Sequence, residues 1–178
     1  MSNQPYKDAL INAMTELGKK DDTIFIGQQI LWKGNPMSDT IVNVPKEKLI
    51  ELPVMEDSQM GMSLGMAMVG KFVITFYPRW DFLICATNQL VNHVDKIGLM
   101  SSDTWNPNMI IRVGKGSDKP IDPGHQHKNN YRHEFKSMCK NIEFHNLENW
   151  SDVELSYKYA LKEGGIHVLI EYPELYYI

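Results

Sequence analysis

The chain has 178 residues, of which 43% are hydrophobic and 22% charged, a composition typical of a soluble globular protein. Its formal net charge of -4 argues against nucleic acid as the main partner, because binding to phosphates needs a basic surface. No apolar run approaches the roughly 20 residues of a membrane-spanning helix, and the polar N-terminus does not have the pattern of a signal peptide. We therefore expect a cytoplasmic protein that binds neither nucleic acid nor membrane.

The predicted elements alternate between helices and short strands. Helices are marked by apolar residues at helical spacing, by Pro5 at the start of the first, and by a capping box of Ser151 and Glu154 in the last. In chain order we expect a helix over 5–17, a strand over 23–27, an irregular stretch over 28–52 with a short strand near 49–52, a helix over 58–69, a strand over 72–76, a long helix from 80 to about 100, a strand over 109–113, a loop over 114–129, a short helix over 131–139, a strand over 142–145, a helix over 151–162 and a strand over 166–171.

The fold class follows from this order. Strands that read as continuous apolar runs and alternate with helices predict a mostly parallel sheet covered by helices on both faces. The sequence contains no linker, repeat or low-complexity segment, so we expect one α/β domain over residues 1–178. The two cysteines, Cys85 and Cys139, fit neither a disulfide framework nor metal-ligand spacing, which indicates free thiols in a reducing compartment.

The first candidate for a functional residue is Glu56. Apolar residues precede this carboxylate, and a helix rich in glycine and methionine follows it. A poorly solvated carboxyl group at such a junction resists ionisation and can share a proton with a bound base. The alternative is a structural role, in which the charge of Glu56 interacts favourably with the helix dipole.

The helix after Glu56 carries four methionines, and Gly61 and Gly65 are four residues apart on it. Methionine fills irregular gaps, so these residues suit either the core or a packed contact between subunits. The glycines allow a neighbouring backbone to approach closely and favour self-association through this helix.

Three further motifs follow in order. They are Phe-Tyr-Pro-Arg-Trp-Asp-Phe over 76–82, Asn-Gln-Leu-Val-Asn-His over 88–93, and Gly-His-Gln-His over 124–127. Together with Glu56, their order and spacing resemble the pyrimidine-binding domain of thiamine-diphosphate enzymes. The resemblance is strongest to the beta subunits of 2-oxo-acid dehydrogenases and to the equivalent domain of transketolase, and it runs from about Tyr6 to the end of the chain.

This resemblance implies roles for two residues. Glu56 matches the glutamic acid that hydrogen-bonds to the pyrimidine ring of the cofactor and so promotes the tautomer that activates the thiazolium ring. Phe82 matches the aromatic residue that lies against the pyrimidine, where offset stacking contributes roughly 0.5–1.5 kcal/mol beyond burial. Trp80 and Tyr77 are the alternatives to Phe82, which can also be a residue of the core.

His127 matches the histidine with which these beta subunits reach the active site from a loop. A histidine titrates near neutral pH and can hold or donate a proton during the reaction. His125 lies on the same loop, and the sequence leaves open which of the two reaches the site. Since no cysteine or carboxylate completes a ligand set with them, we expect no metal bound by this chain alone.

The chain also departs from the family pattern. It contains no Gly-Asp-Gly motif, which in the family belongs to the domain that holds the diphosphate and Mg²⁺. Gln28 and Gln29 follow the first strand where the family usually has two glutamates, and Gln28 remains a candidate for contacting the cofactor through hydrogen bonds. The segment 171–176 resembles the end of the pyrimidine domain.

The resemblance therefore implies the pyrimidine-binding subunit of a heteromeric enzyme. We expect it to share thiamine diphosphate with a diphosphate-binding alpha-type subunit that holds Mg²⁺, in an α2β2 heterotetramer. The reaction is cleavage of a carbon–carbon bond in a 2-oxo acid or a ketose, with decarboxylation or with transfer of an acyl or ketol unit. The alternative is a non-catalytic structural or regulatory partner derived from such a domain.

Overall fold

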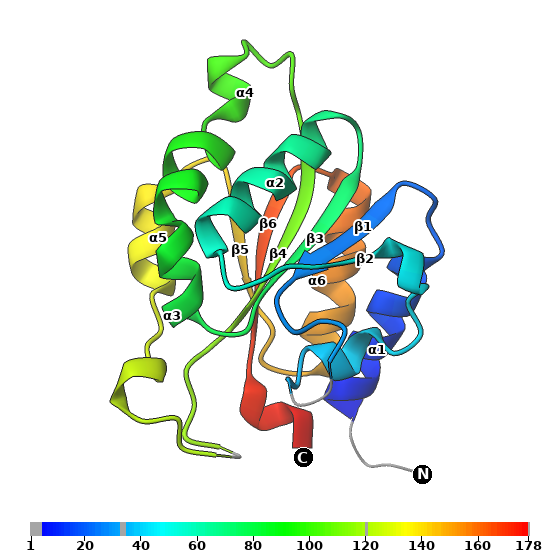
Figure 1. Ribbon diagram of the computed structural model, residues 1–178, viewed down its shortest axis with the longest axis vertical. Helices are drawn as coiled ribbons and strands as arrows, with labels where there is room; N and C mark the ends of the chain where they lie inside the picture. Colours follow the sequence, from blue (N-terminus) through cyan, green and yellow to red (C-terminus); the bar gives the residue numbers. More distant parts are fainter. Residues whose placement is uncertain (1–4, 33–34, 120, 178) are drawn as a thin grey trace.

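The computed structural model describes residues 5–32, 35–119 and 121–177, which form a single α/β domain. Its centre is a parallel sheet of six strands in the order β2-β1-β3-β4-β6-β5 (Figure 1). The predicted fold class is confirmed. The strands are β1 (Thr23–Gly27), β2 (Leu49–Glu51), β3 (Phe72–Tyr77), β4 (Asn108–Gly114), β5 (Glu143–Asn146) and β6 (Ile166–Glu171).

Helices cover both faces of the sheet (Figure 1). Side chains that alternate along each strand enter two separate cores, so that Ile111 faces one side and Ile110 the other. One face carries α2 (Glu56–Met68), α3 (Trp80–Leu83), α4 (Ile97–Met100) and α5 (Arg132–Met138), and the other carries α1 (Pro5–Gly18) and α6 (Trp150–Glu163). No helix in the described part of the chain is long and apolar enough to cross a membrane.

The prediction of one continuous α-helix from residue 80 to about residue 100 is wrong, because the segment changes its helix type along its length. The segment begins as α3, tightens to a 3₁₀ turn at Ile84–Ala86, widens to a π-helical turn at Gln89–Val94 and ends as α4. Its buried residues are three positions apart at Trp80, Leu83 and Ala86, and four positions apart from Ala86 through Leu90 to Val94. A step of four residues drifts by about 40° in an α-helix. The wider π-helical turn compensates for this drift, so Leu90 and Val94 both remain in the core.

Two predicted helix starts are also corrected. α2 begins at Glu56 rather than at Ser58, so Glu56 belongs to the first turn of the helix. The predicted capping box of Ser151 and Glu154 does not form. Asn149 caps α6 instead, because its side-chain oxygen accepts from the amides of Ser151 and Asp152 at 2.9 and 3.0 Å.

A charged pair lies inside the core near the carboxyl ends of the strands. Arg112 on β4 donates from Nε and Nη2 to the Glu171 carboxylate on β6, at 2.5 and 2.9 Å, and both side chains are completely buried. Arg112 also donates to the Thr40 hydroxyl at 2.9 Å, and the Tyr176 hydroxyl donates to Glu171. The pair therefore ties the C-terminal segment to the centre of the sheet.

Candidate functional site

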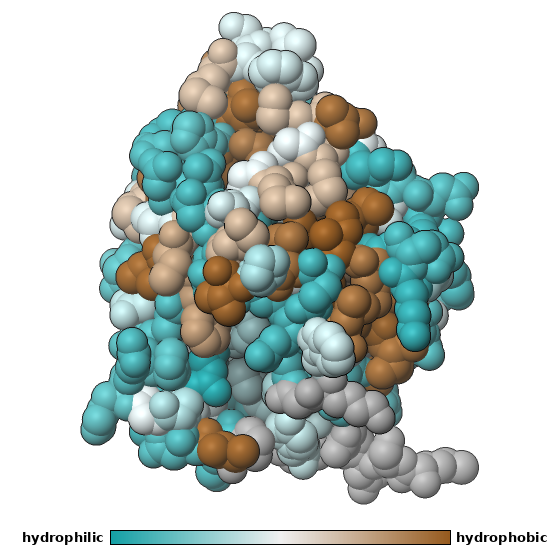
Figure 2. Space-filling view, in the orientation of Figure 1, coloured by the Kyte–Doolittle hydropathy of each residue, from teal (hydrophilic) through white to brown (hydrophobic). Residues whose placement is uncertain are grey.

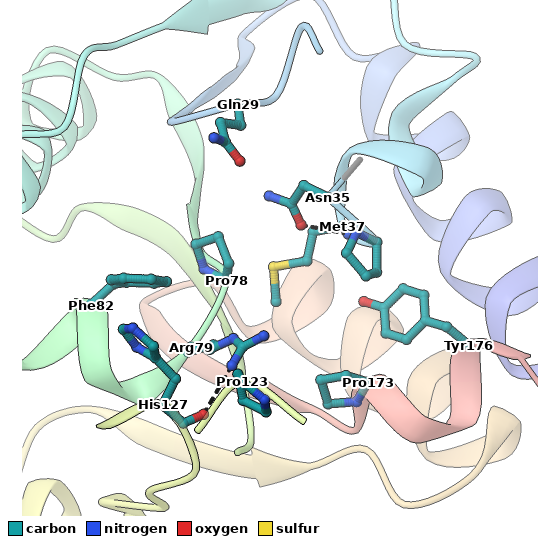
Figure 3. Close-up of a pocket in the computed structure, with 11 residues that line it drawn as sticks. Gln29, Asn35, Met37, Pro78, Arg79, Phe82, Pro123, His127, Pro173 and Tyr176 are labelled. Atoms are coloured by element: carbon teal, nitrogen blue, oxygen red, sulfur yellow. Dashed lines mark hydrogen bonds between the residues drawn. The ribbon is translucent and has the colours of Figure 1, made fainter. Parts of the chain in front are cut away.

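A pocket of about 280 Å³ lies beyond the carboxyl ends of the central strands (Figure 3). β2 and β3 lie on opposite sides of β1, so the strand order reverses beside β1, and open parallel sheets commonly bind ligands at such a point. The lining residues come from segments far apart in the sequence: Gln29 after β1, Pro78 and Arg79 after β3, Phe82 on α3, His127 from the loop after β4, and Tyr176 beyond β6.

The loop that carries His127 is closed at its base. The amide of Gly116 donates to the Asn129 carbonyl at 3.1 Å, and the Asn129 side chain donates to Asp81 on α3 at 2.6 Å. A Cβ atom at Gly116 would lie only 2.1 Å from the carbonyl carbon of Lys128. Any larger residue at this position would therefore push apart the two chain segments that meet at the base of the loop. Arg79 donates to the His127 carbonyl at 3.0 Å and fixes the 3₁₀ turn of His125–His127.

Phe82 and His127 come together at the side of this pocket. Their ring centroids are 5.3 Å apart and the planes are inclined by 41° (Figure 3). His127 is partly buried, and its Nδ1 atom is shielded from solvent with no hydrogen-bond partner among the described residues. The same holds for the side-chain nitrogen of Asn35 on the opposite wall. The pocket thus combines an aromatic ring with unpaired polar atoms. His125, the other histidine of the pair, is exposed.

The two alternatives to Phe82 occupy the core. Trp80 is fully buried and stacks on Phe135 with ring centroids 5.4 Å apart. Tyr77 is buried on β3, and its hydroxyl donates to the Glu56 carbonyl at 3.1 Å. Of the three aromatic residues, Phe82 is the one that lines the pocket.

Glu56 lies beside this region but is not among the residues that line the pocket. Its side chain is partly exposed, and the preceding Val54 is 81% exposed, so the dry setting expected from the sequence is not present within one chain. Glu56 is close enough to Cys85 to act on it: partial burial and the Glu56 charge both raise the pKa of the Cys85 thiol. Cys85 follows Phe82 by about one turn of the same segment.

Gln28 and Gln29 take different directions after β1. The Gln28 amide lies 3.5 Å from Gln59, a fully buried residue that donates to Thr75 and to the Phe76 carbonyl on β3. Gln29 has a left-handed backbone with φ of 56° and lines the pocket. The structure therefore brings Gln29, rather than the predicted Gln28, to the pocket.

Sequence reasoning missed several residues of this site. Glu51, at the end of β2, accepts hydrogen bonds from the amides of Gln29, Ile30 and Leu31 at 2.6, 2.9 and 2.9 Å and so shapes the loop after β1. Arg79 and Asn35 contribute the polar groups of the pocket. Arg79 lies within a motif that the sequence singled out, whereas Glu51 and Asn35 gain importance through contacts across the fold that no local pattern signals.

Comparisons with known proteins agree with this geometry. No protein-family model matches the chain. The beta subunit of 2-oxoisovalerate dehydrogenase from Bacillus subtilis is 28% identical over 120 residues, which cover 65% of this chain and 37% of that protein. The beta subunit of the pyruvate dehydrogenase E1 component from Cyanidium caldarium is 25% identical over 116 residues, which cover 64% and 36%. The chain thus spans about a third of the length of these curated relatives.

Among solved structures, a split-gene transketolase in the form of an inactive beta4 tetramer superposes with a TM-score of 0.73. The superposition covers 95% of this chain and 52% of that one, and at 16% identity it shows the fold. Fold and sequence similarities together define a transketolase-like α/β domain. More particularly, its sequence is similar to beta subunits of 2-oxo-acid dehydrogenases, the proteins that the order of its motifs resembles.

Proposed function

We propose that this chain, as one domain over residues 1–178, is the pyrimidine-binding subunit of a heteromeric thiamine-diphosphate enzyme. The observation that carries the proposal is the contact of Phe82 with His127 in a pocket at the carboxyl edge of the sheet, in a chain similar to beta subunits of 2-oxo-acid dehydrogenases. The activity is cleavage of a carbon–carbon bond next to a carbonyl, in a 2-oxo acid or a ketose, with decarboxylation or acyl or ketol transfer.

The residues of the site fit the pyrimidine half of this cofactor. Phe82 offers a partly exposed ring as a flat apolar surface, and Asn35 offers an amide nitrogen that no described residue pairs. When bound, thiamine diphosphate would supply a nucleophilic thiazolium carbon. Glu56 would hold a proton at a pyrimidine ring nitrogen. Since the single chain leaves this carboxylate partly exposed, a second subunit would complete the site and exclude water from it.

Two residues suit the substrate. His127 has a buried Nδ1 atom that pairs with no other described residue and that can hold a proton or donate it to the oxygen of the reacting carbonyl. Arg79 lies beside His127 in the same pocket, and its guanidinium has donors beyond the one used for the His127 carbonyl. A guanidinium recognises the carboxylate of a 2-oxo acid or the phosphate of a ketose phosphate.

The partner follows from the sequence. The chain has no Gly-Asp-Gly motif, so we propose that the diphosphate and Mg²⁺ are held by a second, alpha-type subunit in an α2β2 assembly. An assembly of this kind also covers the exposed side of Glu56. Gln28 can support the contact with the cofactor through its amide, with Gln59 behind it at 3.5 Å.

We propose that the chain self-associates through the outer face of α2. At Gly65, this face is not covered by any other part of the described chain. A Cβ atom at Gly65 would have no neighbour within 4 Å, while Met62 is 44% and Val69 79% exposed. Pale and brown residues cross the front of the molecule where α2 lies (Figure 2). Small and apolar residues on one exposed helix face allow close packing against another chain.

Gly65→Leu tests this surface. The new side chain has free space in the monomer, and leucine is a better helix former than glycine, so the fold should remain intact or become slightly more stable. In the assembly, it should hold the chains apart and shift the sedimentation coefficient toward that of smaller species. Gly70→Leu is unsuitable as a control because of its φ of 90°, whereas Lys71→Leu adds a leucine near the same helix without filling its face. If the Gly65→Leu variant assembles normally, α2 does not lie at the interface between the chains.

The proposed function is tested by co-expressing the chain with the Gly-Asp-Gly subunit encoded nearest to its gene. Calorimetry with Mg²⁺ should detect thiamine diphosphate binding to the pair and little or none to the chain alone. Phe82→Ala should weaken this binding by about 2–10-fold through loss of stacking alone. Phe144→Ala, which removes another partly buried phenylalanine on β5, controls for a general loss of stability.

The alternative function, a non-catalytic partner, predicts a different result. The two subunits would then assemble without binding the cofactor at Phe82, and Phe82→Ala would change stability alone. Micromolar binding of thiamine diphosphate by the isolated chain would contradict both hypotheses, because both place the diphosphate site in a protein other than this chain.

A further inference from the structure

We propose that Glu143, His145 and His167 form a binding site for a divalent transition-metal ion, with Zn²⁺ as the best-fitting ion. Their potential ligand atoms all lie within 4.8 Å of one another. The site is on the α6 face of the sheet, at the amino end of β6, whereas the candidate active site lies beyond the carboxyl ends of the strands. The sequence alone predicted no such site, because its ligands come from two strands more than 20 residues apart.

The strand register brings the three side chains together. β5 is an edge strand paired in parallel with β6, and Glu143 lies opposite His167. Glu143 and His145 are two residues apart and therefore project from the same face of β5. His145 Nε2 lies 3.1 Å from His167 Nδ1 and 3.9 Å from a Glu143 oxygen. Two ligands at about 2.1 Å from a tetrahedral zinc ion are roughly 3.4 Å apart, so small rotations of the side chains suffice.

The orientation of His167 is already that of a metal ligand. Its Nε2 atom lies 2.8 Å from the Gly164 carbonyl, which can only accept, so Nε2 carries the proton and Nδ1 presents a lone pair toward His145. A metal-binding histidine typically donates its other N–H to a carbonyl in this way. His167 is 1% exposed, and such a carbonyl contact fixes its ring without any rearrangement on binding.

The surroundings orient the other two ligands. The Tyr159 hydroxyl on α6 donates to Glu143 Oε1 at 3.3 Å, and the Tyr159 ring contacts both imidazoles, with centroids 5.7 and 5.8 Å away. Without metal, His145 donates from Nε2 to His167. On binding, that proton moves to Nδ1 through solvent, so the imidazole stays neutral and its Nε2 lone pair faces the ion.

Two imidazoles and one carboxylate leave a fourth position for water or for a ligand from another chain. Glu143 is exposed, so solvent reaches this position. A bound ion would join β5, which has only four residues, to β6 and so hold the edge of the sheet. We therefore assign a stabilising role to the ion rather than a role in the reaction.

The test uses the whole chain freed of metal with a chelator. Titration with Zn²⁺ should show one equivalent bound, and NMR should show the imidazole nitrogens of His145 and His167 shifting together. At a free Zn²⁺ concentration 100 times the Kd, the Tm should rise by about 5–10 °C. Hydrogen exchange in Glu143–Asn146 should slow, and the chelator should reverse each effect.

His145→Gln should weaken Zn²⁺ binding by at least about 100-fold, since loss of a group that only orients a ligand already costs about 10–100-fold. Glu143→Gln should weaken it less. His133→Gln removes an exposed histidine from α5 and serves as the matched control. Unchanged binding in His145→Gln, binding lost instead in His125→Gln, or no stoichiometric binding at all would each overturn the assignment.

Discussion

In the proposed assembled enzyme, replacing Glu56 by glutamine should lower turnover by about 10²–10⁴-fold, the usual effect of losing general acid–base help. Glutamine has nearly the same size and still forms hydrogen bonds, so fold and assembly should persist. It cannot hold and release the proton at the pyrimidine ring. Hydrogen–deuterium exchange at the thiazolium carbon measures this activation separately from later steps, and it should slow together with turnover.

Asp57→Asn is the matched control for this experiment. Asp57 is the next residue of the same helix turn, is exposed and carries the same charge, so both variants change the interaction with the helix dipole similarly. Asp57→Asn should leave the exchange rate unchanged. If Glu56→Gln exchanges as fast as the parent enzyme, Glu56 is a structural carboxylate at a helix start, and the assignment of its role fails.

The second large effect is expected at the buried pair of Arg112 and Glu171. Arg112→Met should lower the free energy of unfolding by about 3–5 kcal/mol, because it leaves the Glu171 carboxylate buried without its cation. The loss should be visible as a lower midpoint in urea unfolding followed by circular dichroism. Tyr176 donates to Glu171 and also lines the pocket, so the substitution should loosen that wall of the site.

The double variant Arg112→Met, Glu171→Leu separates two explanations of this loss. If an unpaired buried charge causes it, removing Glu171 as well should restore much of the stability, since an apolar pair can replace a buried ion pair at little cost. If the double variant is as unstable as the sum of both single variants, the contacts of Arg112 with Thr40 and Phe76 matter more than its charge.

The sequence predicts most of the sheet because a buried parallel strand can be recognised from its own continuous run of apolar residues. The run Phe72–Tyr77, for example, is buried at every position, and a continuous apolar run of this kind has few other interpretations. The segment 80–100 was harder, because apolar residues at four-residue spacing fit an α-helix and a π-helical turn equally well. Which of them forms depends on packing against the sheet, and that packing is absent from the local pattern.

The candidate site was predictable to the extent that its residues lie in recognisable motifs. Phe82 and His127 were found in this way, and the structure brings them together. Glu51, Asn35 and the metal-binding group on β5 and β6 depend on contacts between segments distant in sequence. Individually, these are ordinary polar residues, and only the folded chain brings them to their partners.

The hydrogen bonds of Glu51 have a consequence for how this domain handles anions. Successive amides at Gln29, Ile30 and Leu31, following a left-handed turn, converge on one point and form a nest, a backbone concavity of the kind that binds phosphate groups. In this chain the nest already contains a carboxylate of its own. A phosphate arriving at the carboxyl end of β1 would meet a negative charge instead of free donors. The Glu51 carboxylate thus occupies this backbone concavity and keeps phosphate out of it.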